Sequence, residues 1–408
     1  MPSTRRTFLG TLAVGATAGV AGCSSSCPDS DAPTPTTVFG SGDAGQGFET
    51  PPDSSWPAPR FDAGNTGYAP SRRPPVDSPT VRWRRTLSAP RVDGGGTTSA
   101  PVVADGSVYL LTGAGAVALA LRDGRVRWRA DDVTPVTVPD TTDLAPPVVD
   151  GGRVYLSTAD GVVALHADDG TTAWRHGTAA TGVPTVTDDS VLVPTPDGLA
   201  ALDPRDGSRR WLADVAATRP AVADGTVVAS DEETVALDAA TGDRVWSASV
   251  QAETYPVAAD GFVYLGAYSA LVALGLDDGD ERWRVDRGGG RTFSAPVVTR
   301  DTIYAVERPG EAPAATFALD RATDPPDPRW CSYVGEGTVA AATGDHAFTL
   351  QDAGGRPSPR LVAFTARFGE ASWGYAAGSQ VLSPAILDGG SVAVTRRGTV
   401  VGIGTGGD

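Results

Sequence analysis

One short unit recurs through this chain of 408 residues and constrains its fold more than any other feature. The unit reads as leucine, four residues, glycine, three residues and tryptophan, and Leu237, Gly242 and Trp246 form a clear copy. The glycines of the copies are Gly124, Gly170, Gly207, Gly242, Gly279 and Gly369. Chance does not align so many tryptophans at one spacing, so the chain is an array of similar units rather than two unrelated domains.

A second pattern precedes each copy and supplies two more strands. In Pro101 to Leu110 and Pro256 to Leu265, an apolar run leads to an Asp-Gly turn and then to Val-Tyr-Leu. Asp-Gly pairs provide the positive φ angles of tight hairpins, and β-branched and aromatic residues favour strands. Each unit therefore predicts four short antiparallel strands. Such a sheet cannot bury both faces alone, so units must stack around an axis.

The tryptophans set the number of units. They stand at a mean spacing of about 41 residues, which suits four-stranded propeller blades, and they are Trp83, Trp128, Trp174, Trp211, Trp246, Trp283, Trp330 and Trp373. We predict an all-β fold over residues 56–408, an eight-bladed β-propeller of four-stranded antiparallel blades. Trp83 has no blade before it, and Ser383 to Ile403 has no tryptophan after it. An N-terminal strand near Trp83 would complete the last sheet and close the ring.

The first 55 residues look like an export signal and a tether. Arg5 and Arg6 precede a small, uncharged apolar stretch from Leu9 to Gly22, which resembles a twin-arginine signal and is too short to span a membrane. Val20 to Cys23 is similar to a lipobox, so we expect residues 1–22 to be removed and Cys23 to be acylated. Residues 23–55 are rich in Ser, Pro, Thr, Asp and Gly, which predicts a disordered tether. The domain would then be held at the outer face of the cell membrane by its lipid.

The charge balance narrows the class of partner. The chain has 33 basic and 49 acidic residues, a net charge of −16, and every basic residue is arginine. Nucleic acid is therefore not an expected partner, because phosphates require a basic face. The acidic, lysine-free composition resembles proteins of salt-loving, haloarchaeal organisms. Codon bias is the alternative explanation.

The repeat resembles the pyrroloquinoline-quinone (PQQ)-like β-propeller family over residues 56 to 405. Trp56 and Pro57, followed by residues 65–68, also resemble the lead-in of that family, with Asn65 in place of histidine. The family contains quinoprotein dehydrogenases and non-enzymatic lipoproteins of the BamB type. For a dehydrogenase, the resemblance implies bound PQQ, a calcium site, a catalytic aspartate, a stacking tryptophan and often a pair of adjacent cysteines.

The sequence shows few residues suited to catalysis. Its cysteines, Cys23, Cys27 and Cys331, are not adjacent, and its three histidines have no metal-binding spacing. We expect Cys331 to be buried and free, although a disulfide to Cys27 is the alternative in an exported protein. The aspartates that follow the repeat leucine, Asp203, Asp238 and Asp320, are expected to accept hydrogen bonds within turns.

These observations favour a surface-anchored, non-enzymatic binding or scaffold propeller of the BamB type. We expect no cofactor, no metal and no catalytic residues, and a protein or extracellular ligand as partner. A PQQ-dependent quinoprotein dehydrogenase and a ligand- or carbohydrate-binding sensor are the alternatives.

Overall fold

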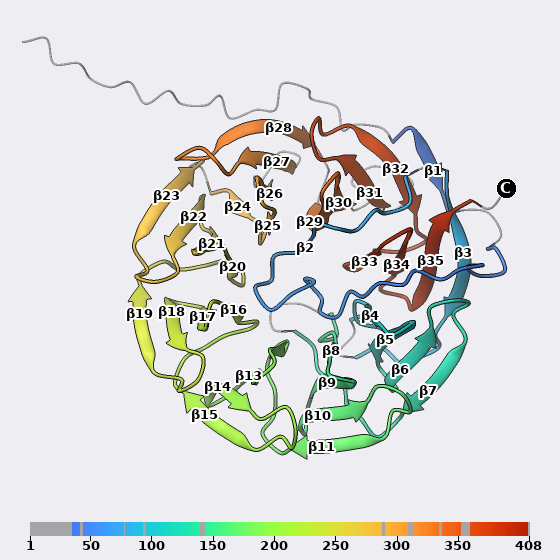
Figure 1. Ribbon diagram of the computed structural model, residues 1–408, viewed down its shortest axis with the longest axis horizontal. Helices are drawn as coiled ribbons and strands as arrows, with labels where there is room; N and C mark the ends of the chain where they lie inside the picture. The colour runs from blue at the N-terminus through green and yellow to red at the C-terminus, as the bar shows by residue number, and fades with distance from the viewer. Residues whose placement is uncertain are drawn as a thin grey trace, which may run out of the picture.

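The computed structural model describes residues 35–40, 44–76, 78–92, 95–138, 143–287, 290–308, 314–333, 337–351 and 360–406. These residues form short β-strands arranged in sheets around a central axis (Figure 1). Within those ranges, no helix is both long and apolar enough to cross a membrane.

The hairpins form where Asp-Gly turns were predicted. Asp105 and Gly106 have φ angles of 47° and 66°, and Asp260 and Gly261 have 48° and 79°. Positive φ at both central positions matches the right-handed twist of the flanking strands, so these turns fix the strand register.

Seven blades follow one another around the ring. Blade 1 consists of β4 (Val102–Ala104), β5 (Ser107–Thr112), β6 (Gly115–Ala120) and β7 (Val126–Ala130). Blade 2 consists of β8 (Val148–Asp150), β9 (Arg153–Thr158), β10 (Gly161–His166) and β11 (Thr172–His176). Blade 3 consists of β12 (Thr185–Val186), β13 (Val191–Thr195), β14 (Gly198–Leu202) and β15 (Arg209–Ala213). Blade 4 consists of β16 (Ala221–Ala223), β17 (Thr226–Ser230), β18 (Thr234–Asp238) and β19 (Arg244–Ala248).

Blade 5 has four strands, whereas blades 6 and 7 carry additional ones. Blade 5 consists of β20 (Val257–Ala259), β21 (Phe262–Ala267), β22 (Ala270–Gly275) and β23 (Glu281–Asp286). Blade 6 has its inner strand in two pieces and consists of β24 (Thr292–Phe293), β25 (Val297–Val298), β26 (Thr302–Arg308), β27 (Ala315–Asp320) and β28 (Asp327–Tyr333). Blade 7 consists of β29 (Gly337–Thr343), β30 (His346–Gln351), β31 (Arg360–Thr365) and β32 (Ala371–Ala376). It is flanked by two N-terminal strands that pair in parallel, β1 (Thr37–Phe39) on β32 and β2 (Tyr68–Ala69) on β29.

The prediction of an eight-bladed propeller is wrong, although the strand near Trp83 does pair with the C-terminal strand as expected. In the described residues, seven blades each come from one continuous segment, whereas the remaining sheet combines two distant parts of the chain. This closing sheet consists of β33 (Ala385–Leu387), β34 (Gly390–Val394), β35 (Thr399–Thr405) and β3 (Pro79–Thr86), and β3 carries Trp83. No hairpin joins β3 to β35, so the closing sheet lacks the glycine turn found in most blades. We call this place, where the two ends of the ring meet, the seam.

The repeat glycine and tryptophan contact each other across neighbouring sheets. Six of the repeat tryptophan rings lie against the glycine of the next sheet, and the pairs are Trp83–Gly124, Trp128–Gly170, Trp174–Gly207, Trp211–Gly242, Trp246–Gly279 and Trp330–Gly369. The same six indoles donate to backbone carbonyls of the next blade at 2.7–3.1 Å. The stacking of blades therefore combines burial of a large ring with a satisfied N–H group.

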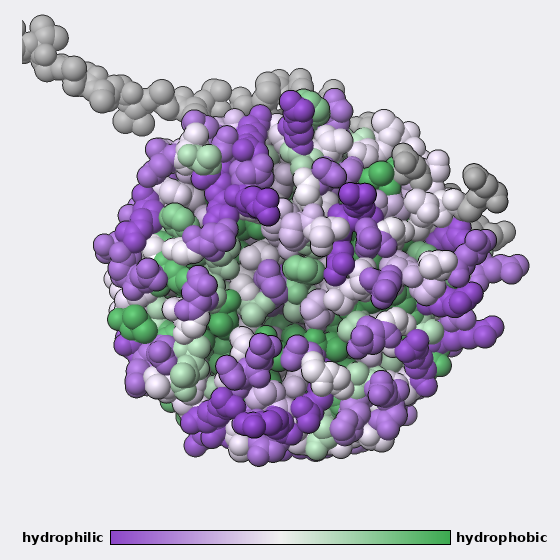
Figure 2. All heavy atoms as spheres, in the orientation of Figure 1, coloured by the Kyte–Doolittle hydropathy of each residue, from purple (hydrophilic) through white to green (hydrophobic). Residues whose placement is uncertain are grey.

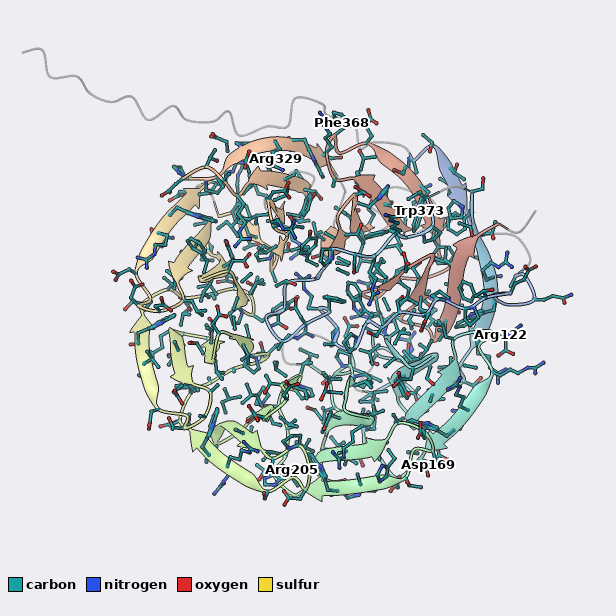
Figure 3. The ribbon with its side chains drawn as sticks, in the orientation of Figure 1. Arg122, Asp169, Arg205, Arg329, Phe368 and Trp373 are labelled. Atoms are coloured by element: carbon teal, nitrogen blue, oxygen red, sulfur yellow. The ribbon has the colours of Figure 1, made fainter. Side chains whose placement is uncertain are left out.

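Trp283 and Trp373 have no such glycine. Blade 6, which follows Trp283, has the stretched copy of the repeat and turns through residues 321–326 without glycine. The closing sheet, which follows Trp373, has no turn at that place. Phe39 of β1 covers Trp373 instead, with ring centroids 5.6 Å apart. Figure 3 shows Trp373 inside the ring, between blade 7 and the closing sheet.

The N-terminal part of the chain packs onto the ring before residue 56. Phe48 is buried with 6 % exposure and joins the hydrophobic core at the seam. Gly45 and Gly47 donate to the carbonyls of Val81 and Arg82 in β3. Much of the segment expected to be a tether, residues 35–40 and 44–55, therefore lies on the folded domain.

The lead-in, residues 56–73, then crosses the axis of the ring (Figure 1). Its backbone carbonyls accept hydrogen bonds from inner-strand amides of six different sheets, and these amides belong to Val103, Val149, Val222, Ala258, Val298 and Ala342. One segment thus fixes the inner edges of most of the ring. Hydrophilic residues dominate the rim in Figure 2, while more of the hydrophobic ones lie toward the centre.

Candidate functional site: a cationic pocket on the propeller axis

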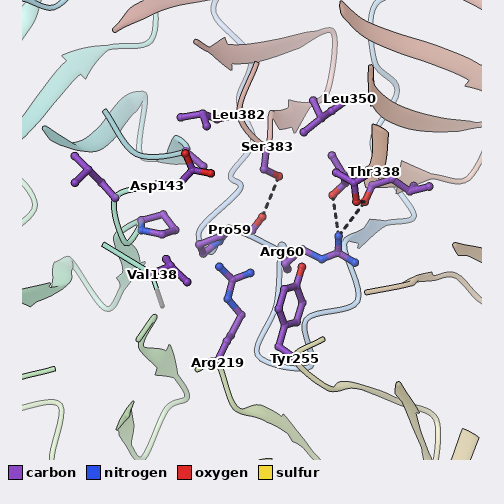
Figure 4. A pocket seen from close by; sticks show the side chains of 15 residues that line it. Pro59, Arg60, Val138, Asp143, Arg219, Tyr255, Thr338, Leu350, Leu382 and Ser383 are labelled. Carbon is purple, nitrogen blue, oxygen red and sulfur yellow. Dashed lines mark hydrogen bonds between the residues drawn. The ribbon is translucent and has the colours of Figure 1, made fainter. Parts of the chain in front are cut away.

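A pocket of about 230 Å³ lies where the lead-in meets the inner ends of several blades (Figure 4). Its walls come from the lead-in, from blade 7, and from residues that precede blades 1, 2, 4 and 5 and the closing sheet. Apolar side chains form much of the wall, and they include Pro59, Leu144, Leu350 and Leu382.

Two of the lining residues occupy the same position in consecutive repeats. Arg219 precedes Pro220 at the start of β16, and Tyr255 precedes Pro256 at the start of β20. A residue before proline is held in an extended conformation. The position therefore projects from the inner end of each blade toward the axis, and in other blades it holds a residue such as Ala100 or Ser383, which line the same pocket.

Arg219 and Arg60 both lie over the ring of Tyr255. The Cζ atom of Arg219 is 4.6 Å from the ring centroid and that of Arg60 is 5.8 Å from it. Both distances lie within the range of cation–π attraction. Burial lowers the pKa of Arg219, an effect that Tyr255 opposes and Arg60 reinforces. Arginine keeps its proton even so, because its ordinary pKa lies far above neutrality.

Arg60 has a structural role as well as a charge. It is buried with 4 % exposure, and its guanidinium donates to the carbonyls of Asn65, Val339 and Pro296. It thus ties the lead-in to blades 6 and 7. Asn65 adopts a φ of 58° and its amide donates to the carbonyls of Pro220 and Pro256 at 3.1 and 3.2 Å. The lead-in therefore positions the starts of the two strands that carry Arg219 and Tyr255.

The acidic group of the pocket is already paired. Asp143 forms an ion pair with Arg396 at 2.7 Å. Calcium requires six to eight oxygen ligands, several of them carboxylates. The described lining offers one paired carboxylate and two guanidiniums, and the guanidiniums would repel a divalent cation. These residues do not fit the calcium site that the family resemblance implies for dehydrogenases.

The predicted site residues lie in three kinds of place. The repeat glycines and tryptophans lie between the sheets, and none of them lines the axial pocket. Cys23, the predicted lipid attachment point, and Cys27 lie outside the described residues. Asp203, Asp238 and Asp320 accept hydrogen bonds from backbone amides two residues further along, at 2.9–3.0 Å, which confirms their turn role.

The expectation of a free Cys331 is wrong. Cys331 lies in the outer strand β28 of blade 6 and is disulfide-bonded. Its partner lies outside the described residues, and the sequence contains two other cysteines, Cys23 and Cys27. Cys331 and the adjacent Trp330 are only partly buried on this outer strand, which leaves the thiol accessible for bonding.

The histidines are not gathered into one site. His176 contacts the carbonyl of Gly207 through Nδ1 at 2.9 Å, and burial lowers the pKa of His346. In the part of the chain that the structure describes, no group of three or more His, Cys, Asp or Glu side chains could hold a metal ion.

The pocket residues Arg60, Arg219 and Tyr255 were missed by the sequence analysis. The repeat was aligned on its leucine, glycine and tryptophan, which lie at the outer strands. The signal that could have found the pocket is the residue before proline at the start of each inner strand, where Arg219 and Tyr255 are the large polar exceptions.

Comparisons with known proteins agree with this architecture. A family described as "Outer membrane protein assembly factor BamB" matches residues 76–285 and 230–324, more than half of the chain. No curated protein sequence matches the chain.

Solved structures of two kinds share the fold at low identity. Quinohemoprotein alcohol dehydrogenase from Comamonas testosteroni has a TM-score of 0.68 and 15 % identity, covering 87 % of this chain and 81 % of the other. BamB from Moraxella catarrhalis has a TM-score of 0.56 and 15 % identity, covering 79 % and 99 %. A europium-containing methanol dehydrogenase has a TM-score of 0.61 and 15 % identity, covering 85 % and 89 %. Similarity at such low identity establishes the fold alone. Because the family model matches more than half of the chain, the chain belongs to the PQQ-like β-propeller family whose model is described as BamB.

Proposed function

We propose that this protein is a surface-anchored binding propeller that holds a ligand or partner and catalyses no reaction. The observation that carries the proposal is the axial pocket, where cationic and aromatic groups meet an apolar wall. Such a combination of apolar surface and a few oriented polar groups is characteristic of ligand sites. The described lining contains no unpaired carboxylate or histidine to act as a base.

The anchor belongs to the same proposal. The twin-arginine motif and the lipobox would export the chain and acylate Cys23, leaving the domain on the outer face of the membrane. The disulfide at Cys331 supports export, because disulfides persist in oxidising compartments. The excess of acidic residues suits a surface that stays hydrated in high salt, and it makes nucleic acid an unsuitable partner.

Two alternatives have different support. A PQQ-dependent dehydrogenase shares the fold with the solved enzymes, but the cationic pocket does not suit calcium. A ligand-binding sensor would use the same axial pocket, and it differs from a scaffold only in what the pocket recognises.

Crosslinking on intact cells tests the proposed function. Cells expressing the tagged chain are treated with a membrane-impermeant crosslinker, and crosslinked partners are identified by mass spectrometry. We expect the same partner to be recovered in replicate experiments, and we expect it to be lost with Cys23→Ser, which should release the protein or leave it unprocessed. A protein that stays on the membrane without any recurring partner would contradict a scaffold role, and unchanged retention of Cys23→Ser would contradict the lipid anchor.

A further inference from the structure

Arg219 is a partly buried cation, and no carboxylate of the described residues forms an ion pair with it. Its Nε atom is shielded from solvent and makes no hydrogen bond among the described residues. Among the described residues, the groups that act on its charge are Tyr255, through its charge and a hydrogen bond, and Arg60. A buried charge is costly unless it is paired or hydrogen-bonded. The ring of Tyr255 offsets only part of that cost.

Arg60, the second cation of the pocket, has partners of its own. Arg60 satisfies its donors with backbone carbonyls, which accept hydrogen bonds but do not neutralise its charge. The acid that acts on Arg60 is Asp62: burial raises the pKa of Asp62, while its bonds to Thr66 and the charge of Arg60 lower it. Asp143 is occupied by Arg396. Arg60 and Arg219 therefore lie beside the same tyrosine ring, and among the described residues only Arg60 has a carboxylate acting on it.

The rest of the pocket limits the size and shape of an anion. The cavity of about 230 Å³ suits a small molecule, and its walls at Pro59, Leu350 and Leu382 are apolar. The hydroxyls of Thr338 and Ser383 also line it, and Ser383 already contacts the carbonyl of Pro59 at 3.5 Å. A planar guanidinium pairs with a planar carboxylate through two parallel hydrogen bonds. The apolar walls would then contact the hydrocarbon part of the same molecule.

We propose that the axial pocket binds a small organic acid, with its carboxylate on Arg219 and its apolar body against the walls at Pro59, Leu350 and Leu382. This inference rests on the proposed binding function and adds the chemical class of the ligand. Phosphate suits the pocket less well, because it has no apolar part and needs more donors than Arg219 and the two hydroxyls offer.

Calorimetry with three probes tests the assignment on the full-length chain. The probes are benzoate, its neutral counterpart benzamide, and inorganic phosphate. We expect benzoate to bind saturably at one site, benzamide to bind at least tenfold more weakly, and phosphate to bind more weakly than benzoate. Absence of benzoate binding, equal binding of benzamide, or tighter binding of phosphate would each overturn the proposal.

Matched variants locate the site. Arg219→Gln removes the charge but keeps polar atoms in the pocket, and we expect it to weaken benzoate at least tenfold. Arg125→Gln is the control, because Arg125 is 85 % exposed on a blade turn and should leave benzoate binding unchanged. Unchanged affinity in a folded Arg219→Gln variant would overturn the assignment. If that variant does not fold, the comparison of benzoate with benzamide on the wild type still decides.

The outcomes separate this inference from the proposed function. Loss of the benzoate site with a recurring crosslinked partner would refute the ligand class and leave the scaffold intact. A benzoate site without any partner would refute the scaffold and support a small-molecule sensor.

Discussion

At the scale of single residues, the contact between tryptophan and glycine holds neighbouring blades together. Gly207 has a φ of +74°, and a Cβ atom built there would lie 2.5 Å from the ring of Trp174. The ring occupies the space that any side chain at Gly207 would need. The repeat therefore requires glycine for two reasons, the backbone conformation and the close approach of the indole.

A pair of glycine substitutions separates these two reasons. Gly207→Ala and Gly225→Ala share nearly the same φ, but a Cβ atom at Gly225 meets nothing within 4 Å. Positive φ costs an L-residue about 1–2 kcal/mol, and overpacking costs about 1–3 kcal/mol more. Urea unfolding should therefore show a larger loss of stability for Gly207→Ala than for Gly225→Ala. Equal losses would mean that the tryptophan contact has no energetic role.

At the scale of elements, β1 seals the seam of the ring. Phe39 packs against Trp373 and Tyr375, with ring centroids 5.6 and 5.7 Å apart. Trp373 lacks the glycine turn that covers most other repeat tryptophans, and its indole N–H has no hydrogen-bond partner in the described structure. The strand thus covers an aromatic cluster that the closing sheet leaves open.

Two substitutions within β1 test this role. Phe39→Ala should lower the free energy of unfolding by about 1–3 kcal/mol, because it removes aromatic contacts from a partly buried site. Val38→Ala is the control, since Val38 is 44 % exposed in the same strand. Thermal or urea denaturation measures both. A similar effect of the two substitutions would show that β1 does not stabilise the seam.

The sequence predicted repeated elements better than unique ones. The hairpins followed from Asp-Gly turns, and the inter-blade contacts followed from the tryptophan spacing, because local turn chemistry and periodic burial recur in each copy. β1, the ordered lead-in and the Cys331 disulfide depend on single long-range contacts. The pocket was missed for the same reason: Arg60 comes from the lead-in, and Arg219 and Tyr255 are exceptions to a repeat position that is small elsewhere.

At the scale of the whole molecule, the lead-in has two roles: it bonds to the inner strands of the ring and it forms part of the axial pocket. The segment that bridges six sheets also places Arg60 beside Tyr255 and bonds the strand starts next to Arg219 through Asn65. These contacts hold the walls of the pocket in place without a ligand, and such preorganisation lowers the entropic cost of binding. A ring anchored by its N-terminal segment, with a preformed axial pocket, is suited to holding a ligand or partner at a surface.

An assay of dehydrogenase activity tests most directly whether this propeller binds without catalysing a reaction. PQQ and Ca²⁺ are added to the purified full-length chain, and dye reduction is followed with alcohols and sugars as substrates. We predict no dye reduction above that of the same mixture without protein, because the pocket has guanidiniums where a calcium site needs carboxylates. Turnover that requires both PQQ and Ca²⁺ would contradict the account.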